Sequence, residues 1–290
     1  MEIRTANRWF GLGMVLLGLG LAVNTLLGPL LAGVIEYPFT DTVRNETLGL
    51  EAVTLMLVAP LAIAAGVLAL RGHRAAGVLA LGPTGYAAYM LVQYVVGPQY
   101  PTYQPSIAWH LVLLVISAAL LLTAWASVHT EQLPVRSRGW AVVMFLLAGF
   151  VLSRWLPAFT GMAAGEPVPA APPDLTMYWS IFMLDLALVV PAAIATGIAL
   201  LTGAAWAGTA LYGVVGWFAL VPPSVAAMAI VKLVRGDPNA AVGDTVVFIV
   251  VTVIFFAIAI WLYRPLLAHS SGGARRSWPR EATGVRSEPG

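Results

Sequence analysis

The chain contains no cysteine among its 290 residues. Disulfides, thiolate metal sites, iron–sulfur clusters and thiol redox chemistry are therefore excluded. Charge is also scarce, because Asp, Glu, Lys and Arg together make up 10% of the residues, against about 25% in an ordinary soluble domain. This deficit excludes a water-soluble globular domain and a disordered chain. Fifteen scattered basic residues are too few to follow a phosphate backbone, which excludes nucleic acid as a partner.

Apolar side chains are abundant instead, at 60% of the residues, and the mean hydropathy is +0.86. A helix needs about 20 apolar residues to cross the hydrocarbon core of a bilayer. Eight stretches meet this requirement: 9–34, 50–70, 75–97, 106–127, 139–158, 177–201, 204–232 and 244–266. The first stretch is too long for a cleaved signal peptide, and we expect it to be retained. The sequence therefore predicts an all-α, polytopic membrane helix bundle with eight transmembrane helices.

The basic residues predict how this bundle lies in a cell membrane, because cytoplasmic loops are enriched in Lys and Arg. With both termini in the cytoplasm, eleven of the fifteen basic residues fall on the cytoplasmic side and four on the outer side. Trp and Tyr gather near the ends of the predicted spans, as expected at the level of the lipid headgroups. We therefore expect a multi-pass protein of the cell membrane with both termini cytoplasmic.

An internal repeat is the strongest pattern in the sequence. Residues 55–90 align without gaps with residues 186–221 at an offset of 131, and fifteen of the 36 positions are identical. Five glycines and one proline are among the identities, which shared apolar composition does not explain. The alignment predicts a first four-helix repeat at 1–131, a second at 132–269 and a disordered cytoplasmic tail at 270–290. Because four helices return the chain to its starting side, the repeats should be parallel, related by an axis along the membrane normal.

Two prolines occupy equivalent positions in this repeat, Pro60 and Pro191. Proline donates no backbone hydrogen bond, so we expect each to kink the second helix of its repeat. The paired glycines would allow helices to approach closely. Packing alone accounts for such positions, and they do not by themselves indicate a functional site.

Asp185 is the most informative ionisable residue, because charges are costly within the hydrocarbon and are therefore rare there. It lies eight residues into the predicted sixth span, about 12 Å deep at 1.5 Å per residue. One hypothesis makes Asp185 a proton or cation site. The other makes it the structural partner of Arg154, whose long side chain could reach inward from the end of the neighbouring span.

A second polar group gathers in the outer half of the predicted first repeat, and consists of Asn24, Glu51, Gln93, Tyr94 and His110. Glu51 and His110 stand near the predicted starts of spans 2 and 4, where they could form a carboxylate–imidazole pair suited to proton transfer. Alternatively, Glu51 caps its own helix N-terminus, and His110 anchors the chain at the membrane interface.

No cofactor or metal is predicted. Of the four histidines, only His110 falls within a predicted span, whereas the other three fall in cytoplasmic connections. One histidine within the membrane cannot supply both axial ligands of a bis-histidine haem. A phosphate-binding loop, a nucleophile elbow and an HExxH motif are all absent from the sequence.

Three classes of function remain. A structural or regulatory membrane subunit is the first expectation, because it needs no polar site and so weakly charged a bundle suits it; the other two classes are the alternatives. A small-solute or proton-coupled transporter is favoured by the repeat, the equivalent prolines and Asp185. A membrane-embedded enzyme acting on a lipid or isoprenoid would use the second polar group. The expected partners are membrane lipid and either a second copy or another membrane protein.

Overall fold

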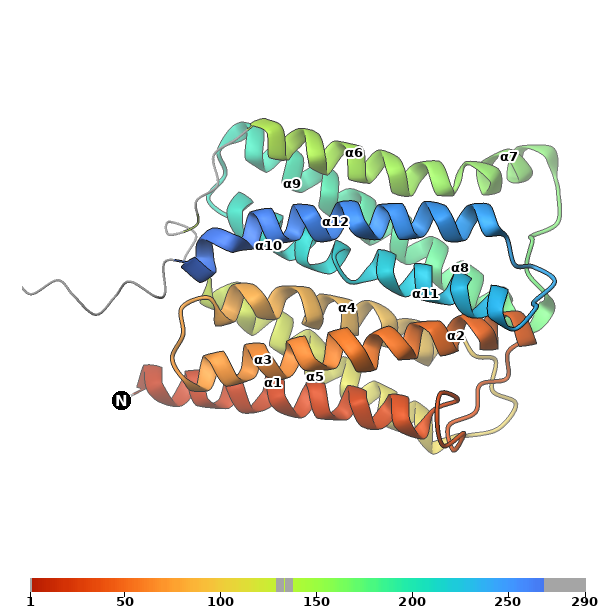
Figure 1. The fold of residues 1–290 in the computed structure, drawn as a ribbon, viewed down its shortest axis with the longest axis horizontal. Helices are drawn as coiled ribbons and strands as arrows, with labels where there is room; N and C mark the ends of the chain where they lie inside the picture. Colours follow the sequence, from red (N-terminus) through yellow and green to blue (C-terminus); the bar gives the residue numbers. More distant parts are fainter. Residues whose placement is uncertain (1, 129–132, 134–137, 269–290) are drawn as a thin grey trace, which may run out of the picture.

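The structure, a computed structural model, describes residues 2–128, 133 and 138–268, and in these residues every regular element is a helix. The helices run roughly along one direction and form two groups side by side (Figure 1). The first group contains α1 to α5 and the second contains α6 to α12. This arrangement confirms the predicted all-α bundle, whereas the predicted tail at 270–290 and the boundary at 131/132 lie outside the described residues.

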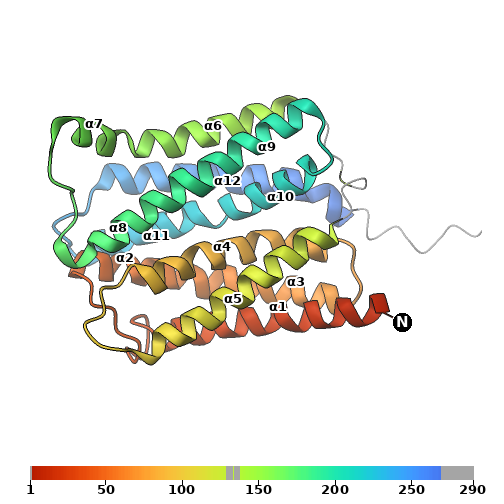
Figure 2. The same cartoon turned by 180° about the vertical axis from the view of Figure 1, so that it is seen from behind.

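The first group has four long rods, one of which consists of three consecutive helical segments. These are α1 (Glu2–Leu27), the rod α2 (Asp41–Val53), η1 (Thr54–Val58) and α3 (Ala59–Leu70), then α4 (Ala76–Val96) and α5 (Pro105–Ser127). Consecutive rods run in opposite directions. Figure 2 shows α5 crossing the back of this group.

The second group follows the same order of long rods with more interruptions. Its elements are α6 (Arg138–Arg154), α7 (Leu156–Ala164), η3 (Pro172–Asp174), α8 (Leu175–Leu184), η4 (Asp185–Val189), α9 (Val190–Thr202), α10 (Ala207–Phe218), α11 (Val221–Val234) and α12 (Val242–Ala268). We call the end of the bundle that carries the connections 28–40, 97–104, 165–174 and 235–241 the long-loop end. The start of α1 and the end of α12 both lie at the opposite end (Figure 1).

Several helices have the length and composition of membrane spans. In the described residues six are apolar enough, and α6 with α7, which bend by 41° at Trp155, make a seventh if the pair is one span. Helix α4 is not among them, because it carries Thr84, Tyr86, Tyr89 and Gln93, all of which are buried against other helices. The apolar side chains of α12, by contrast, are largely exposed on the outside of the bundle. The described residues therefore form an all-helical bundle in which six or seven helices are long and apolar enough to cross a membrane.

Helix α2 begins at Asp41, nine residues before the start predicted from the apolar pattern. Its first turns are polar, and Thr40 caps them by accepting a hydrogen bond from the backbone amide of Val43. These polar turns pack against the second group, so their side chains find partners there rather than in lipid. Glu51 consequently lies inside a long helix, and the suggestion that it caps its own helix N-terminus is wrong.

A π-helical turn precedes each of the two equivalent prolines. In η1 the backbone amide of Ala59 donates to the carbonyl of Thr54, and in η4 the amide of Val190 donates to the carbonyl of Asp185. The next residue is proline, Pro60 or Pro191, which has no amide to donate. Each rod continues through this point as one membrane-length helix, so the prolines are accommodated by a local change of helix type.

The two groups touch most extensively along two pairs of helices, and α4 also contacts α8. In the first, α4 crosses α10, and a Cβ added to Gly82 would lie 3.0 Å from the carbonyl of Gly216. In the second, α2 lies on α11, and a Cβ added to Gly49 would lie 2.6 Å from the carbonyl oxygen of Ala227. Small residues therefore let the backbones of the two groups approach closely, as is usual in membrane bundles.

Candidate functional site

Asp185 is the first residue of η4 and is buried, at 9% exposure. The hydroxyl of Tyr89, from α4 in the first group, donates a hydrogen bond of 2.6 Å to Asp185 Oδ1. The indole nitrogen of Trp155, between α6 and α7, donates one of 2.9 Å to Oδ2. Each carboxylate oxygen thus has a donor, and one of these donors comes from the other helix group.

Arg154 does not make the direct ion pair with Asp185 that the sequence suggested. Its side chain is exposed, and its guanidinium carbon lies 4.8 Å from the ring centre of Phe248 on α12. Arg154 and Asp185 nevertheless line the same small pocket, of about 30 Å³, together with residues of α10 and α11. A volume of this size holds one or two water molecules. The guanidinium therefore faces the carboxylate across a pocket instead of touching it.

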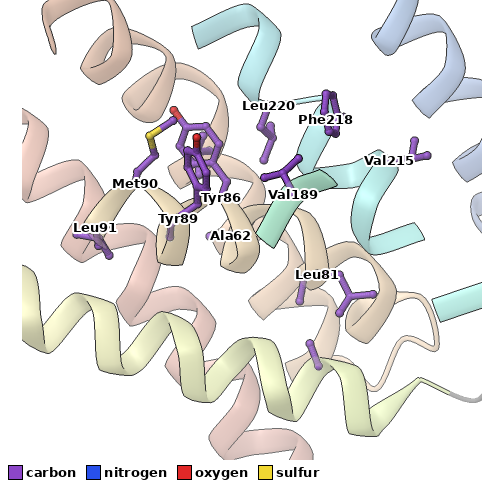
Figure 3. Close-up of a cluster of buried hydrophobic side chains, with 14 of the residues drawn as sticks. Ala62, Leu81, Tyr86, Tyr89, Met90, Leu91, Val189, Val215, Phe218 and Leu220 are labelled. Atoms are coloured by element: carbon purple, nitrogen blue, oxygen red, sulfur yellow. The ribbon is translucent and has the colours of Figure 1, made fainter. Parts of the chain in front are cut away.

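Close to Asp185, two tyrosines of α4 connect the two helix groups. Figure 3 shows Tyr86 and Tyr89 side by side on α4, with Val189 of η4 and Leu220 close to them. The Tyr86 hydroxyl lies 2.7 Å from Ser224 Oγ on α11, and the ring of Tyr89 packs edge-on against Trp217, with centroids 5.1 Å apart. Two neighbouring tyrosines of the first group thus both reach polar side chains of the second.

The second polar group is partly assembled, around His110. Its Nε2 atom lies 2.8 Å from Asn24 Oδ1 on α1 and 3.3 Å from the hydroxyl of Tyr37 in the 28–40 connection. The imidazole also stacks on the rings of Tyr94 and Tyr37, at centroid distances of 5.3 and 5.9 Å. Because Asn24 Oδ1 can only accept, Nε2 carries the proton, and Nδ1 is left as a bare acceptor.

Glu51 belongs to the same region but does not bond to His110. Its Oε2 atom accepts a hydrogen bond of 3.3 Å from the backbone amide of Leu30, and the residue is 1% exposed. Within the part of the chain that the structure describes, Glu51 Oε1 and His110 Nδ1 are buried without hydrogen-bond partners. The predicted carboxylate–imidazole pair is therefore not formed. Gln93 lies apart from this pair as well and donates to the sulfur of Met90.

Tyr37 is held at this cluster by its ring contacts and its hydroxyl. Burial, reinforced by the charge of Glu51, raises the pKa of Tyr37 well above its ordinary value of 10. Its hydroxyl therefore keeps its proton at neutral pH and stays able to donate. Sequence reasoning missed Tyr37, because it lies in a connection, where no helical periodicity indicates which way its side chain points.

A separate polar network joins the two groups at the long-loop end. Asp174 accepts from the backbone amide and hydroxyl of Thr40 at 3.1 and 2.5 Å. Asp237 accepts from Asn45, Thr42 and the amide of Asn239 at 2.9, 3.1 and 2.8 Å. Lys232 Nζ lies 2.7 Å from Glu46 Oε1. Each carboxylate of this network thus ties α2 to the second group.

The environment of Asp237 shifts its ionisation. Burial raises the pKa, but the hydrogen bonds from Asn45, Asn239 and Thr42, together with the ammonium of Lys232, outweigh burial and hold the pKa below its ordinary value of 3.8. The ionised form of Asp237 is therefore the one that stabilises this end of the bundle.

Among the described residues no three His, Asp or Glu side chains gather in a way that could hold a metal ion. A comparison of the chain with protein-family models, with curated proteins and with solved structures finds no match. Any statement on function therefore rests on the geometry of Asp185 and of the cluster around His110.

Proposed function

We propose that the chain is a proton-coupled transporter of a small solute, which crosses the cell membrane eight times with both termini in the cytoplasm. Six or seven of the crossings have the required length and apolar composition. Helix α4 would be the remaining one, since its 21 residues are long enough and its polar side chains turn into the protein. An even number of crossings agrees with the start of α1 and the end of α12 lying at the same end (Figure 1), and the distribution of basic residues favours the cytoplasm for this end.

We further propose that the two helix groups are parallel repeats, 1–131 and 132–269. The same offset of 131 relates the two π-helical turns, Thr54–Val58 and Asp185–Val189, and the starts of α4 and α10 at residues 76 and 207. It also relates Gly72 and Gly203, which have φ angles of 69° and 74° and end the preceding helices. Local backbone features that recur at one offset are what a gene duplication would leave behind.

One observation carries the transport proposal: a buried carboxylate of the second repeat, Asp185, is held by a tyrosine of the first, Tyr89. Ionisable residues inside the membrane are costly and mark functional sites by default. The position is also a π-helical turn, a feature that is frequent at functional sites. A structural subunit has no need of a carboxylate at the contact between its two halves.

The hydrogen-bond geometry explains how a proton would act at Asp185. The ionised carboxylate accepts from Tyr89 and Trp155, and hydrogen bonds to a charged group contribute about 1.5–3 kcal/mol each. Protonation at Oδ2 would weaken the bond from Trp155, because a neutral carboxyl group accepts less strongly than a carboxylate and the indole N–H can only donate. Protonation at Oδ1 would likewise weaken the bond that Tyr89 donates, or let the Tyr89 hydroxyl accept from the new O–H instead. The bond from Tyr89 is the one that joins the two repeats, so protonation that weakens this bond would couple proton binding to their relative movement.

Proton flux into liposomes tests this proposal. The purified protein is reconstituted with a pH-sensitive dye inside, and a potassium diffusion potential, negative inside, drives protons inward. We expect wild-type protein to acidify the interior and Asp185→Asn to abolish this, because the amide keeps the shape of the side chain but does not titrate. Asp41→Asn is the matched control, since Asp41 is exposed and pairs only with Arg44 on its own helix. Its flux should equal that of wild type.

A structural or regulatory subunit would give a different result. The wild-type protein would then move no more protons than empty liposomes do, and Asp185→Asn would lower the thermal midpoint without any change in flux. That outcome would refute transport through Asp185. The membrane-enzyme alternative has less support from the geometry, because Glu51 and His110 do not bond to one another as a general acid and base would.

A further inference from the structure

The cluster around His110 contains two proton acceptors for which the protein supplies no donor. Glu51 Oε1 and His110 Nδ1 have no hydrogen-bond partner within the described residues, and the two residues are 1% and 0% exposed. Leaving a buried polar atom unpaired destabilises the folded protein, because the atom loses its hydrogen bonds to water and gains none in return. Two such atoms in one cluster, whose polar residues come from five different segments, indicate a site that takes up a ligand.

The space around Glu51 limits how large this ligand can be. A Cβ added to Gly28 would lie 2.5 Å from Glu51 Oε1 and 2.8 Å from Oε2, so the backbone covers the carboxylate closely. In the same cluster, the rings of Tyr37, Tyr94 and His110 stack at centroid distances of 5.2 to 5.9 Å. A bulky solute does not fit between these groups, whereas a proton does.

Among the residues that the structure describes, no Lys, Arg or His forms an ion pair with Glu51. Tyr37 comes from the 28–40 connection, Tyr94 from α4 and Tyr100 from the 97–104 connection, and all three act on one another or on Glu51 electrostatically. Helix α11, which packs on α2, presents Lys232, but this ammonium is bound to Glu46 near the start of α2. The titratable and charged groups to consider are therefore Tyr37, Tyr94, Tyr100, His110, Glu46 and Lys232.

The cluster also lies towards the long-loop end from Asp185. Tyr94 and Tyr89 are on the same helix, α4, and Tyr89 is the residue that donates to Asp185. Five residues of an α-helix span about 7.5 Å along its axis. A proton bound at the cluster would thus enter one and a half turns from the tyrosine that contacts Asp185, at the end assigned to the outer side.

We propose that Glu51 and His110 form a second proton-binding site, which takes up the proton from the outer side on its way to Asp185. This site rests on the transport function proposed above. A proton from the long-loop end binds to His110 Nδ1 or Glu51 Oε1, the two unpaired acceptors, and leaves the same atom when it moves on. Asn24 and Tyr37 are positioning residues, because they fix the imidazole through Nε2 and leave Nδ1 free.

Proton flux into liposomes tests the path, with the dye and the driving potential as for Asp185. Glu51→Gln should lower the rate by about tenfold or more, as expected when a positioned proton carrier is lost, and should weaken its dependence on external pH. Glu36→Gln is the matched control, since Glu36 is exposed in the adjacent connection, and its flux should equal that of wild type. His110→Gln is a second variant in case Glu51→Gln does not fold, as judged by gel filtration and thermal melting.

Infrared difference spectroscopy during a pH titration tests proton binding without reference to transport. The carbonyl band of a protonated carboxylic acid should titrate in wild type and in Asp185→Asn, and the part due to Glu51 should disappear in Glu51→Gln. If Asp185→Asn stops the flux while Glu51→Gln and His110→Gln leave it unchanged, the path is overturned and the transport function stands. If wild type moves no protons but the Glu51 band titrates, the transport function falls and the proton site remains. If no band is lost in Glu51→Gln, the proton site itself is refuted.

Discussion

The contact between α2 and α11 gives a prediction whose size follows from the structure. Replacing Gly49 with alanine adds a Cβ that would lie 2.5 and 2.6 Å from the carbonyl carbon and oxygen of Ala227, and close to the amide of Met228. These atoms belong to the backbone of a helix, which cannot turn aside as a flexible side chain can. The two helices must therefore move apart, which separates the two helix groups along this contact.

Overpacking of this kind costs about 1–3 kcal/mol. In a chain of this size each kcal/mol lowers the thermal midpoint by about 2–4 °C, so Gly49→Ala should melt several degrees below wild type. Gly149→Ala is the matched control, because Gly149 is also helical and a Cβ there would meet nothing within 4 Å. Because alanine has a higher helix propensity than glycine, Gly149→Ala should leave the thermal midpoint unchanged or raise it. Melting curves in detergent provide the measurement, and equal midpoints for the two variants would refute the close packing of α2 on α11.

Two further predictions concern the ends of the bundle. Asp237→Asn should lower the thermal midpoint at neutral pH. Because folding holds the pKa of Asp237 below its ordinary value, its stabilisation is present above about pH 4 and is lost as the pH falls through the folded-state value. The difference between wild type and Asp237→Asn should accordingly shrink between about pH 5 and pH 2, and a constant difference would contradict the assignment. A reporter fused after Gly290 should be active only if it works in the cytoplasm, and activity on the outer side would refute the proposed orientation.

Much of the fold class could be predicted because it depends on local composition. Long apolar stretches with few charges form helices in a membrane wherever they occur in the chain. The start of α2 could not be found in this way. Asp41, Arg44 and Asn45 look like a loop in the sequence, and they are helical because Thr40 caps the helix and the second group supplies Asp174 and Asp237 as partners from 134 and 192 residues away.

Only part of the candidate site could be predicted from the sequence. Asp185 stood out because it is a lone acid in an apolar stretch, but its partners did not. The sequence suggested Arg154 because its charge is opposite to that of Asp185. Tyr89 and Trp155 lie 96 and 30 residues from Asp185 in the sequence, and only the packing of the helices brings them to it. The repeat contained one further signal, because Trp155 and Asn24 are separated by the repeat offset of 131 residues. Trp155 donates to Asp185 in the second half, and Asn24 accepts from His110 in the first.

Proton transport through Asp185 requires that the pocket beside it opens to the aqueous phase, and thiol labelling tests this most directly. The chain has no cysteine of its own, so a membrane-impermeant maleimide reports only an introduced thiol. Val225 lines the pocket beside Asp185, whereas Val215 on the adjoining helix is fully buried at 0% exposure and serves as the control. In sealed vesicles Val225→Cys should be labelled at a rate that changes with pH, and Val215→Cys should stay unlabelled. If Val225→Cys reacts from neither side at any pH, yet reacts fully after denaturation, the pocket does not open to the aqueous phase and this requirement is contradicted.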